Sequence, residues 1–320
     1  MGEVPILSRR QFTLSLLAQP QGSQIQTVRG PVPAANLGIT LMHEHILVNF
    51  TGAAYNQDEA FRAALPKLEE LKARGCQTLV ECTPEHIGRD PALLKRLSIA
   101  SGLHILTNSG YYAAAKDKYV PEHAWQETPE QIAQRWIKEA TKGIASTGIR
   151  PAFLKLGVDA GPLSDIDKKL IQAGKRAHKA IGLRLHIHTG DGVAAREILG
   201  SLGNTPPSAF IWVHAQNEKN REIHKEAARA GAWIEFDGIN AKSLDAHLAA
   251  VAEMLAAGFG NRILISQDSG WYRPGEPGGG TFNGYTLLFD QFIPALRKKG
   301  ITEAQIRALL VDNPARVLSR

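Results

Sequence analysis

Short apolar runs alternate with longer amphipathic segments from Gly38 onward, and this alternation is typical of repeated βα units in a parallel sheet. Eight of the runs are rich in apolar or β-branched residues and have the length of a buried strand. They cover residues 39–42, 78–82, 104–108, 152–156, 184–188, 210–213, 233–237 and 262–266. Eight strands separated by helices, with no GxGxxG turn, favour an α/β fold of the closed (β/α)8 TIM barrel type over an open doubly wound sheet.

The segments between these runs carry helical periodicity. Apolar residues recur at helical spacing over residues 166–181, with Ser164 placed to cap the start of the helix and Gly182 placed to end it. No break in composition divides the rest of the chain. We therefore expect one barrel domain over residues 30–320, preceded by an N-terminal segment of residues 1–29.

The N-terminal segment contains a candidate export signal. The motif Ser-Arg-Arg-Gln-Phe at residues 8–12 resembles a twin-arginine signature, and an apolar stretch over residues 12–18 follows it. This stretch is only about seven residues long, so the ordinary terminus of a cytoplasmic protein is the alternative to a periplasmic or exported one. Nowhere else does the chain approach the ~20 uninterrupted apolar residues of a membrane span.

Composition narrows the classes of partner and cofactor. The formal charge is +6, but Lys and Arg are scattered along amphipathic segments and aromatic residues make up only 7%, which argues against a nucleic-acid interface. The two cysteines, Cys76 and Cys82, exclude a disulfide framework, and their spacing offers no Cys-based zinc or redox motif. The expected partner is therefore a small molecule.

The first strand leads into the sequence Met42-His43-Glu44-His45-Ile46. Side chains alternate along a strand, so His43 and His45 share one face while Glu44 points away. Imidazoles spaced about 7 Å apart along a strand can converge on one metal ion. For this motif by itself, two satisfied surface histidines are the alternative. Glu44 could orient the loop next to the ligands, but we expect it to be a carboxylate at the rim of the barrel.

The fourth strand carries Lys155 inside an apolar run. Burying an unpaired ammonium costs several kcal/mol, so a lysine that faces the barrel interior needs a physical reason. Its side chain could extend to the rim or pair with an acid. Alternatively, Lys155 could react with CO₂ to give a carbamate, an anionic oxygen ligand able to bridge two metal ions.

Histidines also end the fifth and sixth strands, at His188 and His214, and Asp268 follows the eighth. Catalytic groups of a TIM barrel gather at the carboxyl ends of its strands, so these side chains are expected to meet in a ring suited to zinc or a similar ion. His186 shares the face of His188 one layer deeper, where we expect it to support a ligand or fill the core. Most of the remaining histidines are expected to be solvated: His86, His104, His123, His178, His224 and His247.

With these motifs the chain resembles the phosphotriesterase family of the amidohydrolase superfamily. The resemblance runs from Gly30 to Leu318 and includes the sequence Leu-Met-His-Glu-His-Ile at residues 41–46 and Ile-Ser-Gln-Asp at residues 265–268. It also includes Lys155, the histidines that end the fifth and sixth strands, and a C-terminal segment similar to the phosphotriesterase homology branch, whose substrates are unassigned. The resemblance independently implies a TIM barrel with a metal-dependent hydrolase site.

The same resemblance implies a set of metal ligands. His43, His45 and Asp268 would hold the more buried of two divalent ions, and His188 and His214 the more exposed one. Lys155, as N6-carboxylysine, and a hydroxide would bridge them, with Asp268 also acting as the catalytic acid and base. Zinc is the expected metal for a His-rich set, although Mn²⁺, Co²⁺ or Fe²⁺ would also fit.

Two aromatic residues are candidates for substrate binding. Tyr112 is similar to the family tyrosine that lines the metal centre in lactonase-like members, and a loop aromatic packed on the rim is the alternative. Trp271 begins a glycine-rich segment, residues 271–281, that follows Asp268 and is expected to cover the site.

Two positions depart from the family pattern. Gly238 stands where organophosphate-hydrolysing members have histidine and lactonase-like members have arginine, and Asn217 replaces the aspartate expected in the proton relay. We expect a hydrolase of a lactone or another carboxylic ester. The alternatives are a phosphotriesterase (aryldialkylphosphatase) acting on organophosphates, and a non-catalytic barrel that binds a ligand at the same mouth. The resemblance also suggests a homodimer.

Overall fold

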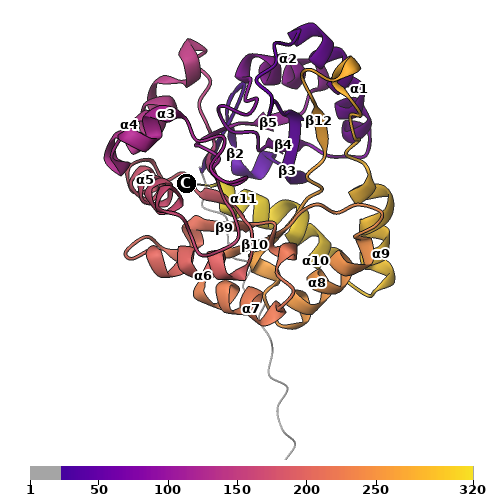
Figure 1. Cartoon of the computed structure of the whole chain (residues 1–320). Coiled ribbons are helices and arrows are strands. Elements are labelled where there is room, and N and C mark those ends of the chain that lie inside the picture. Colours follow the sequence, from indigo (N-terminus) through magenta and orange to yellow (C-terminus); the bar gives the residue numbers. More distant parts are fainter. Residues whose placement is uncertain (1–22, 320) are drawn as a thin grey trace, which may run out of the picture.

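Parallel strands close into a ring in the computed structural model, which describes residues 23–319 (Figure 1). Neighbouring strands pair in the order β11-β10-β9-β8-β7-β6 in one sheet and β12-β3-β4-β5 in another. β5 and β6 occupy one position in the ring, because a single residue separates them. Between the last strand and the first, Asp268 N donates to His43 O at 3.0 Å and His45 N donates to Ser269 O at 2.9 Å. The described residues therefore form the predicted (β/α)8 TIM barrel.

Each predicted strand has a counterpart in the ring. The strands are β3 (Thr40–Leu47), β4 (Thr78–Glu81), β5 (His104–Leu106), β6 (Asn108–Ser109), β7 (Phe153–Val158), β8 (Leu185–Thr189), β9 (Phe210–Val213), β10 (Trp233–Phe236) and β11 (Ile263–Ile265). The main difference lies in β3, which continues to Leu47 and so includes His43 and His45. The apolar run in the sequence ends at Met42, because polar side chains follow it. The backbone nevertheless stays extended as far as Leu47.

Helices surround the ring (Figure 1). The α-helices are α1 (Gln57–Ala73), α2 (Pro91–Ser101), α3 (Glu122–Gln126), α4 (Pro129–Lys142), α5 (Asp165–Ile181), α6 (Gly192–Ser201), α7 (Arg221–Ala230), α8 (Leu244–Ala256), α9 (Ile293–Lys298), α10 (Glu303–Arg307) and α11 (Asn313–Leu318). Shorter 3₁₀ and π segments are η1 (Ala34–Asn36), η2 (Ile144–Ser146), η3 (Pro207–Ala209), η4 (Ala215–Asn217), η5 (Gly260–Arg262), η6 (Pro277–Gly279), η7 (Leu288–Phe292) and η8 (Ala308–Asp312). The ends of α5 are as predicted: the Ser164 hydroxyl caps its first turn, and Gly182 ends it with a left-handed φ of 73°.

The apolar runs do not predict three of the strands. β1 (Gln24–Thr27) and β2 (Gly30–Pro33) form an antiparallel hairpin, so regular structure begins before residue 30. β12 (Gly270–Tyr272) pairs in parallel with β3, beyond the end of β11. The candidate export motif at residues 8–12 lies outside the described residues. Within the described part of the chain, no helix is long and apolar enough to cross a membrane.

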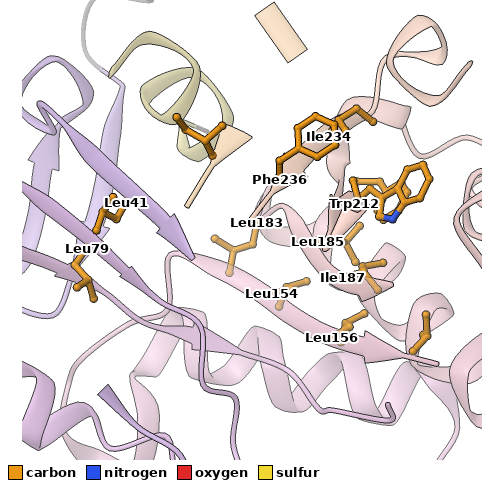
Figure 2. Close-up of a cluster of buried hydrophobic side chains, with 14 of the residues drawn as sticks. Leu41, Leu79, Leu154, Leu156, Leu183, Leu185, Ile187, Trp212, Ile234 and Phe236 are labelled. Atoms are coloured by element: carbon orange, nitrogen blue, oxygen red, sulfur yellow. The ribbon is translucent and has the colours of Figure 1, made fainter. Parts of the chain in front are cut away.

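Apolar side chains of the ring pack on both of its faces. Those that point outward pack with the surrounding helices, and Figure 2 shows Leu154, Leu156, Leu185 and Ile187 among them. Those that point inward, such as Phe153, form a second cluster inside the ring. Full burial stabilises each large apolar side chain by about 1.5–3 kcal/mol. This packing fixes the strands, and the groups at their carboxyl ends are fixed with them.

Candidate metal centre at the carboxyl ends of the strands

A small cavity with a volume of about 70 Å³ lies at the carboxyl ends of the barrel strands. Its walls include every side chain that the sequence predicts as a metal ligand: His43, His45, Lys155, His188, His214 and Asp268. These side chains come from β3, β7 and β8 and from the residues that follow β9 and β11. The barrel therefore brings together nitrogen and oxygen atoms from segments far apart in the sequence.

A shift in strand pairing lets β3 supply both of its histidines. The register of β3 against β4 changes between Leu41 and Glu44, as it does at a β-bulge. Met42 packs in the cluster inside the ring, and the next residue, His43, also faces the interior. His43 and His45 share one face as predicted by alternation, and the irregularity places that face toward the interior although Met42 also points inward.

His43, His45 and Asp268 form one group that could hold a metal ion. Each offers one atom to a set in which all atoms lie within 4.8 Å of one another. Asp268 Oδ1 lies 3.2 Å from His45 Nε2 and 3.8 Å from His43 Nε2, yet this buried oxygen accepts no well-aligned hydrogen bond from the described residues. A buried carboxylate oxygen without a partner is costly unless a cation balances it. The donor set therefore fits a divalent metal ion.

Lys155 lies beside this set, inside the ring. Its side chain is only 2% exposed, which excludes the alternative in which the ammonium reaches the rim. The Nζ atom lies 3.4 Å from His43 Nε2. An amine in this position gains little from solvation as a cation, and conversion to an anionic carbamate would suit a site that holds metal ions.

His188 and His214 form a second pair next to the first set. Their rings pack edge to face with centroids 4.3 Å apart, and the His214 ring lies 5.0 Å from that of His43. The Tyr112 hydroxyl lies 3.3 Å from His188 Nδ1. This contact occupies Nδ1 and leaves Nε2 of the same ring available to a metal ion. The two sets of donors are thus adjacent, as a two-metal site requires.

Two buried acids on and after β10 orient the histidines, and neither is predicted as a site residue from the sequence. His43 Nδ1 lies 3.2 Å from Glu235 Oε1 and 3.3 Å from Asp237 Oδ2. Asp237 Oδ1 also contacts His214 Nδ1, and Asp237 Oδ2 accepts the backbone N–H of His214 at 3.1 Å. Carboxylates of this kind fix the tautomer of a ligating histidine and raise its basicity. Their position inside a buried strand is the same signal that draws attention to Lys155.

A second chain of polar groups reaches His45 from β4. The Thr83 hydroxyl lies 2.7 Å from His45 Nδ1 and donates to Glu81 Oε1. Both Thr83 and Glu81 are buried. His45 is therefore oriented through a hydroxyl, whereas His43 meets carboxylates directly.

The electrostatics of the cavity favour neutral imidazoles, the form that binds metal. Burial, and then the charge of Lys155, lower the pKa of His43 to about 3. Burial likewise lowers the pKa of His45 and that of His188. Burial opposes ionisation of Asp268, but the adjacent His45, His43 and His214 together hold the pKa of its carboxyl group well below the usual range.

Glu44 is not at the rim, and that prediction is wrong. Its side chain is fully buried and accepts hydrogen bonds from Ser266 Oγ at 2.8 Å, Gln267 N at 2.9 Å and Ser269 N at 2.8 Å. Burial raises the pKa of Glu44 to about 8. The residues that follow β11 fold over this carboxyl group, so Glu44 holds the segment that carries Asp268.

Strained backbone occurs in this segment and at the end of β9. His214, Asp268 and Trp271 have positive φ angles of 62°, 51° and 78°, although none of them is glycine. Left-handed residues of this kind are costly, and they cluster where the surrounding structure holds a functional group in place. Here the strained residues include two of the predicted ligands and one predicted substrate-binding residue.

The entrance to the cavity is aromatic. Trp271, Tyr112 and Phe50 line it, and Trp271 packs against His45 with ring centroids 5.1 Å apart. The indole of Trp271 donates to Asp268 O at 3.2 Å. Phe50 packs against Tyr119 at 5.0 Å and faces Trp271 at 6.1 Å. Both predicted substrate-binding residues therefore line the cavity with Phe50, and Tyr119 packs against Phe50.

Comparison with known proteins decides the family. The model of the Phosphotriesterase family matches residues 23–318. The chain belongs to the phosphotriesterase family. Membership of this family confirms the prediction that the chain is a metal-dependent hydrolase.

Three relatives illustrate the range of the family. The phosphotriesterase homology protein of Mycobacterium tuberculosis is 30% identical, and the match covers 93% of this chain and 98% of that protein. An N-acetyltaurine hydrolase of Salmo salar is 26% identical, with coverage of 92% and 98%. A crystal structure of a mutant PTE-like lactonase of Deinococcus radiodurans superposes with a TM-score of 0.84 at 30% identity, with coverage of 92% and 99%.

The two residues that depart from the phosphotriesterase family pattern, Gly238 and Asn217, have different surroundings. Gly238 has a positive φ of 69°, and a Cβ placed there would lie 3.2 Å from Gln216 Nε2. Gln216 Nε2 donates to Asp237 Oδ1 at 2.7 Å, so this amide lies close to the space beside the glycine. Asn217 is exposed in η4. Gly238 thus supplies no side chain that could contact a substrate.

Three of the remaining histidines are buried: His186, His224 and His247. His186 is buried inside the ring and packs on Phe153 with ring centroids 4.2 Å apart, which agrees with the predicted core-filling role. His224 and His247 are also buried, so the prediction that they are solvated is wrong. Each ring lies 2.7 Å from a carbonyl oxygen, His224 from Ala215 O and His247 from Asp237 O. These contacts tie helices α7 and α8 to the strand ends.

Proposed function

We propose that the chain is a binuclear-metal hydrolase that attacks an ester bond, with a lactone or another carboxylic ester as substrate. The observation that carries the proposal is the Asp268 Oδ1 atom, which is buried without a hydrogen bond next to the Nε2 atoms of His43 and His45. A cation is the simplest partner for such an oxygen. The neighbouring pair His188 and His214 supports a second ion.

The proposed ligands follow from this arrangement. His43, His45 and Asp268 would hold one ion, and His188 and His214 the other. Lys155, carboxylated on Nζ, would be shared between the two ions. Divalent cations there would supply Lewis acidity, which lowers the pKa of water and polarises the bond to be cleaved. Zinc is the proposed metal, because imidazole nitrogen dominates the donor set.

The chain's own groups then perform three tasks. Neutral His43 and His45 keep their orientation through the acids and the hydroxyl that hold their Nδ1 atoms. Asp268 would accept the proton of the attacking water and return it to the leaving group. The aromatic entrance, which includes Tyr112 and Trp271, limits access of bulk water and contacts the substrate.

Gly238 argues against an organophosphate, and because the position also lacks the arginine of lactonase-like members, other carboxylic esters stand beside lactones in the proposal. The position lacks the histidine expected of organophosphate-hydrolysing members, which places phosphotriesterase activity second. Because one relative is an N-acetyltaurine hydrolase, a carboxylic amide belongs in the same substrate screen. Higher turnover of paraoxon than of any lactone, ester or amide would reverse this order.

Two further parts of the proposal rest on sequence features. The Arg-Arg motif within residues 8–12 would direct export of the folded protein, which fractionation of cells expressing the full chain tests. A homodimer would be the form in solution, which light scattering at several concentrations tests. Neither feature affects the assignment of the metal centre.

Elemental analysis of purified protein tests the centre itself. We expect about two metal equivalents in the wild type after reconstitution with zinc and bicarbonate. Lys155→Ala should lose most of the metal, and Lys155→Ala and Asp268→Ala should each abolish ester turnover. Lys168→Ala, which removes an exposed lysine of α5, is the matched control and should keep both metal and activity.

The outcomes separate the competing functions. Activity retained in either ligand variant contradicts the assigned mechanism. A wild type that stays free of metal after reconstitution, and that hydrolyses nothing in the screen, favours the non-catalytic ligand-binding barrel.

A further inference from the structure

Three successive residues near the entrance form a left-handed turn. Ala115, Lys116 and Asp117 have φ angles of 64°, 58° and 61°, and no glycine or asparagine is among them. Left-handed backbone is unfavourable for such side chains, and runs of it are rare. Something outside the turn must therefore hold it in place.

The carboxylate of Asp159 holds this turn. Ala115 N donates to Asp159 Oδ1 at 2.9 Å, and Lys116 N donates to Asp159 Oδ2 at 2.7 Å. Adjacent backbone N–H groups that point the same way form an anion-binding concavity, and here a side chain of the same protein fills it. Charge-assisted bonds of this kind are stronger than those between neutral groups.

Asp159 follows directly on β7, the strand that carries Lys155. The end of this strand also docks the start of the loop, because Tyr112 forms a parallel bridge with Gly157 and Ala113 N donates to Gly157 O at 3.0 Å. A Cβ at Gly157 would lie 2.4 Å from the Tyr112 ring, so only glycine permits this approach. Strand β7 thus anchors the loop at two points, Gly157 and Asp159.

The anchored loop carries one wall of the entrance. Before the turn, Tyr112 packs on His188 with ring centroids 5.3 Å apart. After the turn, Tyr119 packs on Phe50 at 5.0 Å, and Tyr112 and Tyr119 lie 6.5 Å apart. The left-handed turn joins these two tyrosines and sets where the second one lies relative to the first.

We propose that Asp159 is a positioning residue that holds the Tyr119–Phe50 wall of the entrance, and that this wall selects substrates by the size of the group that leaves. The proposal rests on the proposed function, since it concerns access to the same centre. Phe50 lines the cavity and packs on Tyr119. A large leaving group that extends from the centre toward this side of the entrance would lie along the wall that the two rings form.

Steady-state kinetics on a phenyl ester and a methyl ester of the same acid test the selection by leaving group. For Asp159→Asn we expect KM for a phenyl ester to rise about tenfold, because an amide offers one acceptor oxygen to two N–H groups. The kcat for both esters, KM for the methyl ester and the metal content should stay within about twofold of wild type. Asp165→Asn, which neutralises an exposed carboxylate at the start of α5, is the control and should leave every value unchanged.

Rescue distinguishes positioning from a general loss of structure. Asparagine adopts the left-handed conformation more readily than alanine or lysine. Adding Ala115→Asn and Lys116→Asn to the Asp159→Asn variant should therefore restore KM for the phenyl ester. A fall in kcat for both esters, or a failure of this rescue, would overturn the proposal.

Two further measurements keep the test decisive. If Asp159→Asn does not fold, Tyr119→Ala removes the wall directly and should raise KM for the phenyl ester alone; no change would overturn the proposal.

If the wild type hydrolyses no ester, the proposed function fails. Hydrogen exchange over residues 113–120 then decides whether Asp159 anchors the turn. Faster exchange in Asp159→Asn than in Asp165→Asn supports the anchoring of the turn, and equal exchange refutes it.

Discussion

The two proposed metal positions are supported from different parts of the molecule. We call the set of His43, His45 and Asp268 the inner position, and His188 with His214 the outer position. At the inner position, both histidines have their Nδ1 atoms fixed from inside the barrel, one by Glu235 and Asp237 and one by Thr83. At the outer position, His214 meets Asp237, but His188 meets the hydroxyl of a loop tyrosine.

This difference predicts that the two positions bind their metal ions with unequal affinity. Each position has one histidine held by a carboxylate and one held by a hydroxyl, but the Thr83 hydroxyl at the inner position itself donates to the Glu81 carboxylate, which raises the basicity of the imidazole that it holds. Of the groups that support the inner position, Glu235 lies on β10, Asp237 follows it directly and Thr83 lies two residues after β4, whereas Tyr112 lies three residues after β6 in the entrance loop. We therefore expect the inner ion to be held more tightly and the outer ion to depend on the order of that loop.

Asp237→Asn should have the largest effect, because this carboxylate serves both positions. It contacts His43 and His214 and accepts the backbone N–H of His214. Loss of a supporting carboxylate costs about 10- to 100-fold in metal affinity, and here we expect that loss for both ions. Calorimetric titration of the metal-free protein with zinc measures it, and Asp245→Asn in α8 is the control. A weakening confined to one ion would show that the two positions do not share this support.

Much of the framework, and the grouping of the candidate ligands in one cavity, could be predicted from sequence. Strands of this barrel are buried on both faces, so they appear as nearly continuous apolar runs such as residues 210–213. Against that background a polar residue such as Lys155, or one that ends a run such as His214, stands out. The ring closure then brings these strand ends together, which is why a linear pattern could predict a compact site.

Other features depend on contacts that the pattern does not contain. Glu44 appeared to be a rim residue, because nothing in the sequence shows that residues 266–269 fold over it. The left-handed turn at residues 115–117 lacks the glycine or asparagine that would mark it, since Asp159 stabilises it from another loop. Glu235 and Asp237 could have been found as charges inside a buried strand, by the reasoning applied to Lys155.

Thr83→Val should weaken the inner position alone, by about tenfold. The substitution keeps the volume but removes the hydroxyl between His45 and Glu81. His45 would lose its only side-chain partner on Nδ1 among these groups, while the contacts of His188 and His214 stay intact. Titration with zinc should show a lower affinity for one ion only. The same change at the exposed Thr141 of α4 is the control, and equal weakening of both ions would contradict the division into two positions.

Tyr112→Phe should have the smallest effect, and it falls on the outer position. The ring stays against His188, but the hydroxyl 3.3 Å from His188 Nδ1 is lost. One hydrogen bond of about 0.5–1.5 kcal/mol corresponds to a roughly two- to tenfold loss of affinity for the outer ion. Tyr111→Phe, which changes the neighbouring residue whose hydroxyl contacts His123, is the matched control. If Tyr112→Phe weakened both ions, the entrance loop would support the whole centre, and the contrast between a strand-held inner ion and a loop-held outer ion would have to be given up.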